Sequence, residues 1–184
     1  MLIDDGTGRG YRARVDEDHR LLTLATTESA MSHAARVHAT AYSWVIVSYD
    51  FDAGDTILLV RNDSPTLLLY IDYAWAWIKT DGAILLQHPT AAFTGAGTAV
   101  VGANLNTLSG VAADASAWAD ETGNTQGTIL DMRYCPAAAS QGVEFLAQDG
   151  LIVLGHEESL GIDAVIGGDE CLAVMQGYFH APPD

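Results

Sequence analysis

The chain has 184 residues, which is enough for one domain with a substantial core and too few for two domains of ordinary size. Hydrophobic residues make up 49% of it and charged residues only 17%, a balance opposite to that of disordered chains, so a folded domain is expected. Twenty-four acidic residues stand against eight basic ones, and the net charge of −16 argues against binding nucleic acid through its phosphates or docking on an anionic membrane.

Targeting signals and cysteines bear on where the protein works. No segment has the basic start and apolar run of a signal peptide, and the apolar stretches are too short and too interrupted to span a bilayer. We therefore expect a soluble protein that stays in the cytoplasm where it is made. The two cysteines, Cys135 and Cys171, cannot form a disulfide framework, and we expect buried free thiols.

Residues 1–40 are predicted to form an extended N-terminal arm with short strands. Glycines at positions 6, 8 and 10 favour an adaptable start, and residues 11–15 and 20–27 have the composition of two short strands. Residues 29–40 are ambiguous: their alanines favour a helix, but a strand or a loop stays open.

The arm also differs from the rest of the chain in charge. Five of the eight basic residues fall within the first 36 residues, namely Arg9, Arg12, Arg14, Arg20 and Arg36. The arm is therefore near neutral, whereas the remainder carries almost all the negative charge. We expect the arm to lie on an acidic neighbouring surface such as a sister subunit. The alternative is that its arginines form solvated ion pairs with nearby carboxylates, which contribute little energy.

Residues 41–184 are predicted to form a β-sandwich domain. Its first half contains strand-like segments at 42–49, 56–60, 67–77 and 83–87, separated by turn-forming residues such as those at 62–65. The clearest segment is 67–77, where large residues occupy every odd position from Leu67 to Trp77. This period of two predicts that all of them share one face of a long strand.

The second half is less regular before it becomes clear again. Residues 88–141 are rich in glycine, alanine and threonine, with short strands expected at 100–101 and 128–132, and residues 111–120 are compatible with one or two helical turns. Four strand-length runs follow at 143–147, 151–154, 162–166 and 171–179. The fold class expected from this spacing is mainly β, an antiparallel β-sandwich that is jelly-roll-like.

A search for reactive side chains predicts no catalytic, cofactor-binding or metal-ligating residue. No serine lies in a Gly-x-Ser-x-Gly turn, and the glycines near the start lack the Gly-Lys-Ser/Thr ending of a phosphate loop. His33 and His38 are five residues apart, which we interpret as opposite faces of a strand and off-register on a helix, so a jelly-roll metalloenzyme is the least favoured class. Asp50, Asp52 and Asp55 suit an acidic hairpin tip better than a calcium loop.

Trp75 and Trp77 are the most conspicuous aromatic pair. They share a predicted strand face, which favours packing in the core or at a subunit interface. Stacking of these rings on a sugar is the alternative.

Three stretches, in their shared order, resemble a broad group of tailed-phage virion proteins. The opening of that group is similar to residues 8–21 (Gly-Arg-Gly-Tyr-Arg-Ala-Arg-Val-Asp-Glu-Asp-His-Arg-Leu), followed by Thr26-Thr-Glu-Ser29 and His33. A middle segment is similar to Gln87-His-Pro-Thr90 and Gly102-Ala-Asn-Leu-Asn106, and the ending to Glu158-Ser-Leu-Gly-Ile162 and Gly177-Tyr-Phe179. The low lysine content and the acidity depart from the group's usual pattern.

The resemblance implies a non-enzymatic particle component such as a capsid decoration (cement) protein, a head fibre or a tail accessory. It implies a homo-oligomer, by analogy a trimer, on the capsid surface of a virion, with the major capsid protein of the same phage as partner and no cofactor, nucleic acid or membrane. The residues expected to contact a subunit or the capsid are Arg9, Tyr11, Arg12, Arg14 and Arg20. The alternative function is a carbohydrate-binding or receptor-facing module of a tail or fibre.

Overall fold

The computed structural model describes residues 29–48, 51–52, 55–89, 95–121, 127–136, 142–146, 152–168 and 170–182, together with the backbone of three short strands within residues 1–28. The first elements are β1 (Ile3–Asp4), β2 (Arg12–Val15), β3 (Leu21–Leu22), α1 (Ala30–His33) and the π-helical turn η1 (Ala34–His38). The strands that follow are β4 (Ala41–Ser48), β5 (Thr56–Asn62), β6 (Leu68–Ile78), β7 (Gly82–His88), β8 (Thr98–Ala99), β9 (Ala103–Asn104), β10 (Ala115–Glu121), β11 (Thr128–Cys135), β12 (Val143–Leu146), β13 (Ile152–Leu154), β14 (Ser159–Ala164) and β15 (Cys171–His180).

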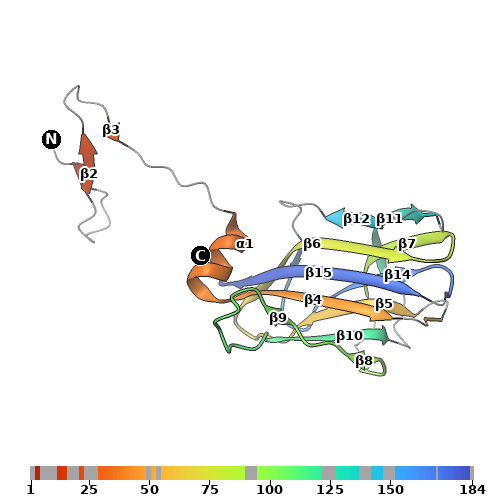
Figure 1. Cartoon of the computed structure of the whole chain (residues 1–184). Helices are drawn as coiled ribbons and strands as arrows, with labels where there is room; N and C mark the ends of the chain where they lie inside the picture. The colour runs from red at the N-terminus through yellow and green to blue at the C-terminus, as the bar shows by residue number, and fades with distance from the viewer. Residues whose placement is uncertain are drawn as a thin grey trace.

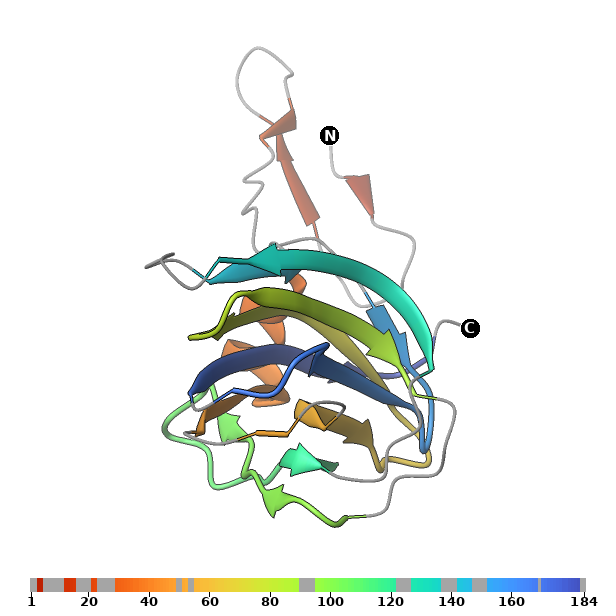
Figure 2. The same ribbon diagram turned by 90° about the vertical axis from the view of Figure 1, so that its right-hand side faces the viewer.

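Two antiparallel sheets form a β-sandwich, which confirms the predicted class (Figure 1). Sheet I has the strand order β12-β6-β15-β4-β9, and β13 also pairs with β6. Sheet II has the order β11-β7-β14-β5-β10-β8. Figure 2 shows the same sandwich from its end, with one sheet layered on the other.

The strand pairs are nested along the sequence. The chain pairs β4 with β15, β5 with β14, β6 with β12 and β13, and β7 with β11. Consecutive pairs alternate between sheet I and sheet II. The chain from β4 to β15 is therefore one long hairpin that is wound into two layers.

The core lies between the two sheets. Sheet I contributes buried side chains such as Trp44 and Leu69, and sheet II contributes Leu58, Ile84 and Leu160. Each of these is shielded from water, and full burial of one large apolar side chain stabilises the fold by roughly 1.5–3 kcal/mol. Cys135 and Cys171 are also buried, and both are free thiols as expected.

Strand β6 departs from the predicted alternation in the middle of its length. Gln176 of β15 lies opposite Tyr73, but the next residue, Gly177, lies opposite Ile71, so Asp72 is an extra residue in β6. Such a β-bulge moves the following residues to the other face. Leu69 and Ile71 face the core on one side of the bulge, whereas alanines 74 and 76 do so on the other. The prediction that all odd positions from 67 to 77 share a face was therefore wrong.

Residues 111–120 contain a strand where helical turns were considered. Strand β10 begins at Ala115 and pairs with β5 over most of its length. Its alanines at 117 and 119 are buried, while Trp118 between them is half-buried. The cross-strand contacts with β5 outweigh the helix preference of alanine.

The ambiguous segment 29–40 is helical and packs on sheet I. Ser29 caps α1 by accepting a hydrogen bond from the Ser32 amide at 3.1 Å, and η1 ends at Ala39 in the left-handed conformation. Ala34 packs against Ala41 and Tyr178 on the side of sheet I that faces away from the core. This helical segment covers one end of that outer face.

Candidate functional site

The outer face of sheet I carries two rows of apolar side chains, which we call the outer apolar patch. In one row Val45, Val174 and Trp75 lie opposite one another on β4, β15 and β6. In the next row Val47, Leu172 and Trp77 do the same. The patch consists of these six residues from three adjacent strands.

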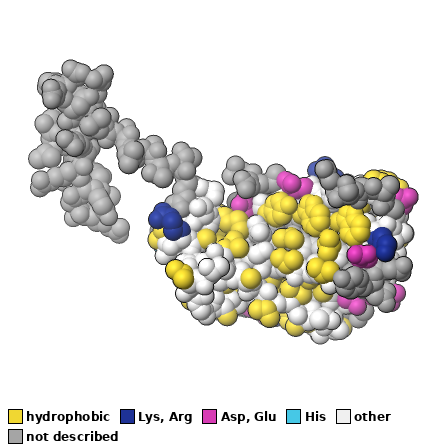
Figure 3. Space-filling model, in the orientation of Figure 1, with side chains coloured by type: hydrophobic (Ala, Val, Ile, Leu, Met, Phe, Trp, Pro, Cys, Tyr) yellow, Lys and Arg dark blue, Asp and Glu magenta, His cyan; other side chains and the backbone are white. Residues whose placement is uncertain are grey.

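Much of this patch is open to solvent in the described structure. Val45 and Val47 are 54% and 58% exposed, and the other four residues are half-buried. Figure 3 views this face and shows hydrophobic side chains gathered over β4, β15 and β6. A contiguous apolar surface of this kind marks an interaction site more often than a simple solvent-facing surface.

Polar groups lie at the rim of the patch. The adjacent row contains Ser43, Gln176 and Tyr73, and Glu144 of β12 lies opposite Trp75. Burial, and then the nearby Glu144 carboxylate, raises the pKa of the Tyr73 phenol. The rim is therefore negative, consistent with the acidity of the chain.

A cavity of about 590 Å³ joins this rim to the start of α1. It is lined on one side by Ser29, Met31 and Ser32, and on the other by Asp72, Tyr73 and Gln176. The point at which residues 1–28 join the sandwich therefore lies beside the rim of the outer apolar patch.

A second cavity, of about 560 Å³, lies on the other side of the helical segment. Its polar and aromatic lining includes His33, His38, Tyr70, Tyr178 and His180. The rings of Tyr70 and Tyr178 stack with their centroids 5.2 Å apart. Burial, and then the charge of Asp72, raises the pKa of Tyr178.

His33 and His38 are brought together in this second cavity. Their ring centroids lie 5.2 Å apart in an edge-to-face arrangement. The expectation that they lie off-register was wrong, because a π-helical turn bonds residues five apart and places them on the same side. In the described part of the chain, however, no three His, Cys, Asp or Glu side chains form a group that could hold a metal ion.

The acidic cluster expected at the β4–β5 turn is partly described. Asp50 lies outside the described residues, and the amide of Asp55 donates to the carbonyl of Asp52 at 3.1 Å. Burial, followed by the charges of Asp120 and Asp52, raises the pKa of Asp55. The structure therefore adds Asp120, from the end of β10, to the carboxylates of this cluster.

The connections from β8 to β9 and from β9 to β10 expose further apolar side chains. Val101 is 88% exposed, Leu108 97% and Val111 58%. The loop between β9 and β10 is held by its own polar groups, since Asn104 Nδ2 donates to the carbonyls of Ala39 and Val111 at 2.8 and 3.1 Å. These hydrogen bonds fix the backbone of the loop, on which the apolar side chains are exposed to solvent.

Strand β11 forms an edge of sheet II and is also apolar. It pairs with β7 on one side, and Ile129, Leu130, Met132 and Tyr134 are 46–65% exposed. Natural proteins usually shorten, charge or cover such edges. An eight-residue apolar edge strand is therefore a second surface suited to contact with another chain.

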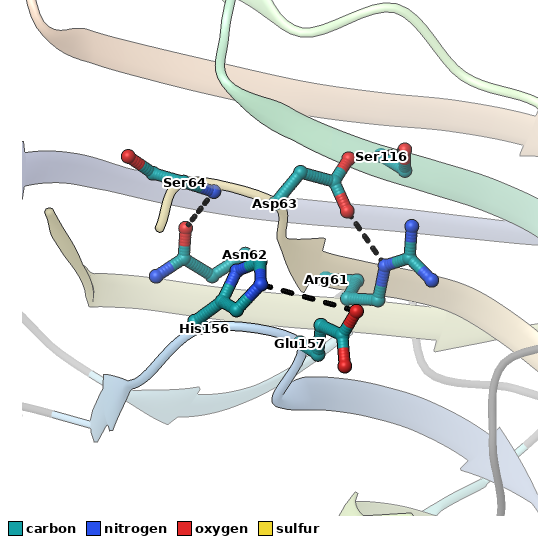
Figure 4. Close-up of polar contacts among 7 residues, drawn as sticks. All are labelled: Arg61, Asn62, Asp63, Ser64, Ser116, His156 and Glu157. Carbon is teal, nitrogen blue, oxygen red and sulfur yellow. Dashed lines mark hydrogen bonds and ion pairs between the residues drawn. The ribbon is translucent and has the colours of Figure 1, made fainter. Parts of the chain in front are cut away.

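The end of β5, at the same end of the sandwich as the start of β6, holds a polar cluster (Figure 4). The buried Asn62 side chain accepts from the Ser64 amide at 2.9 Å, as the predicted turn at 62–65 requires. Asp63 accepts hydrogen bonds from Arg61 Nε at 2.6 Å and from the Ser116 hydroxyl. The bond from Ser116 joins the end of β5 to β10.

The residues predicted for subunit or capsid contact are only partly described. Arg12 and Arg14 lie in β2, where they pair in register with Asp4 of β1 and Leu22 of β3. Arg9, Tyr11 and Arg20 lie outside the described residues. Their proposed role therefore stays a prediction.

The outer apolar patch was only half anticipated from the sequence. Trp75 and Trp77 were singled out, but Val45, Val47, Leu172 and Val174 were not. A signal was present, because residues 44–47 and 171–175 are apolar at nearly every position. Such continuous runs are typical of strands that are covered on both faces.

Comparisons with known proteins identify no family for this chain. No protein-family model matches the sequence, and comparison with curated proteins and with solved structures gives no significant match. In the described residues, no helix is long and apolar enough to cross a membrane.

Proposed function

We propose that the chain is a non-enzymatic structural protein of a phage particle, a capsid decoration protein that binds the outer capsid surface as a symmetric oligomer. The observation that carries the proposal is the outer apolar patch. Strands β4 and β15 are apolar on both faces, yet only one face is covered by the other sheet. An assembly contact supplies the missing cover.

The winding of the strands supports a jelly roll as the fold of this protein. Eight strands paired as nested hairpins in two sheets are the plan of a jelly roll, which occurs in viral capsid proteins and in lectins. A fold shared by both classes does not decide between them. The resemblance to phage virion proteins at residues 8–33, 87–106 and 158–179 favours the capsid.

Symmetry and charge fit this role. Many copies on a lattice bind by avidity even when each contact is weak. Closed rings of identical subunits, of which a trimer is our proposal by analogy, bury matching surfaces such as the patch and the β11 edge. A strongly negative body keeps the free subunits soluble.

The test uses the full-length chain. Light scattering is expected to give a mass of two or more times the 19.5 kDa of one chain. The protein is also expected to sediment with undecorated capsids of its phage. A monomer at high concentration that also fails to sediment with capsids would overturn the proposal.

A pair of valine variants makes this test specific to the patch. Val45→Glu places a charge on the patch, whereas Val165→Glu places one at a site of similar exposure, 54% against 51%, in the turn after β14. We expect Val45→Glu to weaken assembly at least tenfold, about 1.4 kcal/mol, and Val165→Glu to leave it unchanged. Equal effects of both variants would count against the patch.

A second candidate function is carbohydrate binding by the same face. The half-buried Trp75 alternates with the buried Ala74 and Ala76 and so faces away from the core, and Glu144 lies opposite it. Aromatic faces beside carboxylates suit stacking on sugars. A glycan panel that changes the tryptophan fluorescence of the wild type, but not of a Trp75→Ala variant, would support this reading over capsid decoration.

A further inference from the structure

We propose that the outer apolar patch is the seat of the N-terminal arm, residues 1–28, of a neighbouring copy of this chain. The inference rests on the proposed self-association. It names the two surfaces that form the contact, the outer apolar patch of one copy and the N-terminal arm of another. It differs from a contact between two sandwich bodies, in which the patch would face another patch or the β11 edge.

The first argument is the place where the arm joins the sandwich. Ser29 lines the cavity that it shares with Asp72, Tyr73 and Gln176. Tyr73 and Gln176 lie opposite each other in the row next to Trp75 and Val174. The arm of each copy therefore starts at a cavity whose opposite wall, Tyr73 and Gln176, lies about 7 Å, two residues along a strand, from the patch.

The second argument is length. Twenty-eight residues precede Ser29, and an extended chain of this length spans about 90 Å. Sheet I is far narrower, since its strands lie about 4.8 Å apart. The arm of one copy can thus leave its own sandwich and cross the outer face of a neighbour.

The third argument is charge, which decides between the arm and a second body. Residues 1–28 contain four arginines and six carboxylates, a net charge of −2, so the remaining residues carry −14 of the total of −16. Two bodies in contact would bring −14 against −14, whereas the arm brings almost no net charge. Arginines in the arm can also form ion pairs with the carboxylates of Asp72 and Glu144 at the rim of the patch.

The fourth argument is the sequence of the arm itself. In Tyr11-Arg-Ala-Arg-Val15 apolar residues alternate with arginines, and Arg12–Val15 is a strand in the structure. A strand with this alternation has one apolar and one cationic face. Such a strand suits an apolar surface that is rimmed by carboxylates.

The experiment is photo-cross-linking in the full-length protein. A benzophenone is attached to the new thiol of Val45→Cys, on the patch, or of Val165→Cys, the control of similar exposure. The native thiols of Cys135 and Cys171 are buried and serve as unlabelled background. After illumination, the cross-linked peptides are identified by mass spectrometry and the products are sized on a denaturing gel.

The expected result is a cross-link from position 45 to residues 1–28 of a second chain, seen as a product of dimer size, with none from position 165. Arg12→Glu combined with Arg14→Glu is expected to lower its yield several-fold, whereas Arg133→Glu, an exposed arginine on β11, is not. A cross-link to residues 29–184, a cross-link within one chain, or no cross-link to the arm overturns the proposal.

The outcome is separable from the proposed function. Binding to capsids is measured by sedimentation, without the label. Cross-linking of arm to patch in a protein that does not bind capsids would retain the arm exchange and reject the decoration role. Capsid binding without an arm cross-link would retain the decoration role and reject the arm exchange.

Discussion

The side-chain amide of Asn62 donates a hydrogen bond to the carbonyl oxygen of Leu154, 92 residues further along the chain, at 2.9 Å. The same nitrogen donates to the carbonyl of Leu67, also at 2.9 Å, and the amide oxygen accepts from Ser64. One fully buried side chain thus connects the end of β5, the start of β6 and the end of β13. It joins the two sheets at the end of the sandwich where the helical segment packs on Ala41 and Tyr178.

We predict that Asn62→Ala strongly destabilises the protein. The substitution leaves the buried Leu154 carbonyl, the partly buried Leu67 carbonyl and the Ser64 amide without their partner, which costs about 2–4 kcal/mol in the free energy of unfolding. Asn106→Ala is the control, since Asn106 accepts from the Leu108 amide in an exposed loop, and its cost should stay below about 1 kcal/mol. Urea denaturation of both variants measures the difference, and equal losses would contradict the assigned role.

A second prediction concerns the bulge in β6. A Cβ atom at Gly177 would lie 2.5 Å from the Tyr70 carbonyl oxygen, so Gly177→Ala must push β6 and β15 apart. We expect a loss of about 1–3 kcal/mol. Gly110→Ala is the matched change, because nothing lies within 4 Å of its Cβ position, and thermal melting should show it within about 0.5 kcal/mol of the wild type.

The bulge also shows what the sequence could predict and what it could not. The alternation in residues 67–77 correctly located a strand, because a period of two is a local property. The side of the sheet that each residue faces depends on Asp72 being an extra residue opposite Gln176 and Gly177, and pairing with a strand a hundred residues away is not local. Trp75 and Trp77 were therefore recognised as a pair but not placed on the outer face.

The difference between local and long-range determinants also explains two other mismatches, the helical turns considered for residues 111–120 and the off-register placement of His33 and His38. Strand β10 has an alanine-rich sequence that locally favours a helix, and pairing with β5 overrides this preference. His33 and His38 approach each other only because the chain forms a π-helical turn, which is rare in proteins. Long apolar segments such as 171–179 were located correctly, since apolar residues at nearly every position leave a strong signal.

The cysteines give a third prediction. Cys135 and Cys171 are both fully buried, and the Cys135 thiol contacts the Ile78 carbonyl at 3.7 Å. In the folded protein neither thiol should react with a water-soluble disulfide reagent within minutes, and both should react in denaturant. The Val45→Cys variant provides the positive control, since position 45 is half exposed. Immediate reaction of the wild type at neutral pH would contradict the burial.

A fourth prediction follows from the raised pKa of Asp55. Burial is the main cause, and repulsion from Asp120 and Asp52 adds to it, so the folded protein binds this proton more tightly than the unfolded chain does. The stability that this carboxyl contributes is therefore present below its ordinary pKa and is lost as pH rises through the raised value. At neutral pH the ionised Asp55 opposes folding.

Asp55→Asn removes this penalty and keeps the shape of the side chain. At pH 7 we expect its melting temperature to exceed that of the wild type by about 1–3 °C, a small change because the site is partly solvated. At pH 3 the wild-type carboxyl is protonated, so the difference should disappear. Asp114→Asn, at an exposed position before β10, is the control and should show a smaller change at either pH. A melting temperature of Asp55→Asn that is lower than wild type at pH 7 would mean that the carboxylate has a stabilising partner rather than like-charged neighbours.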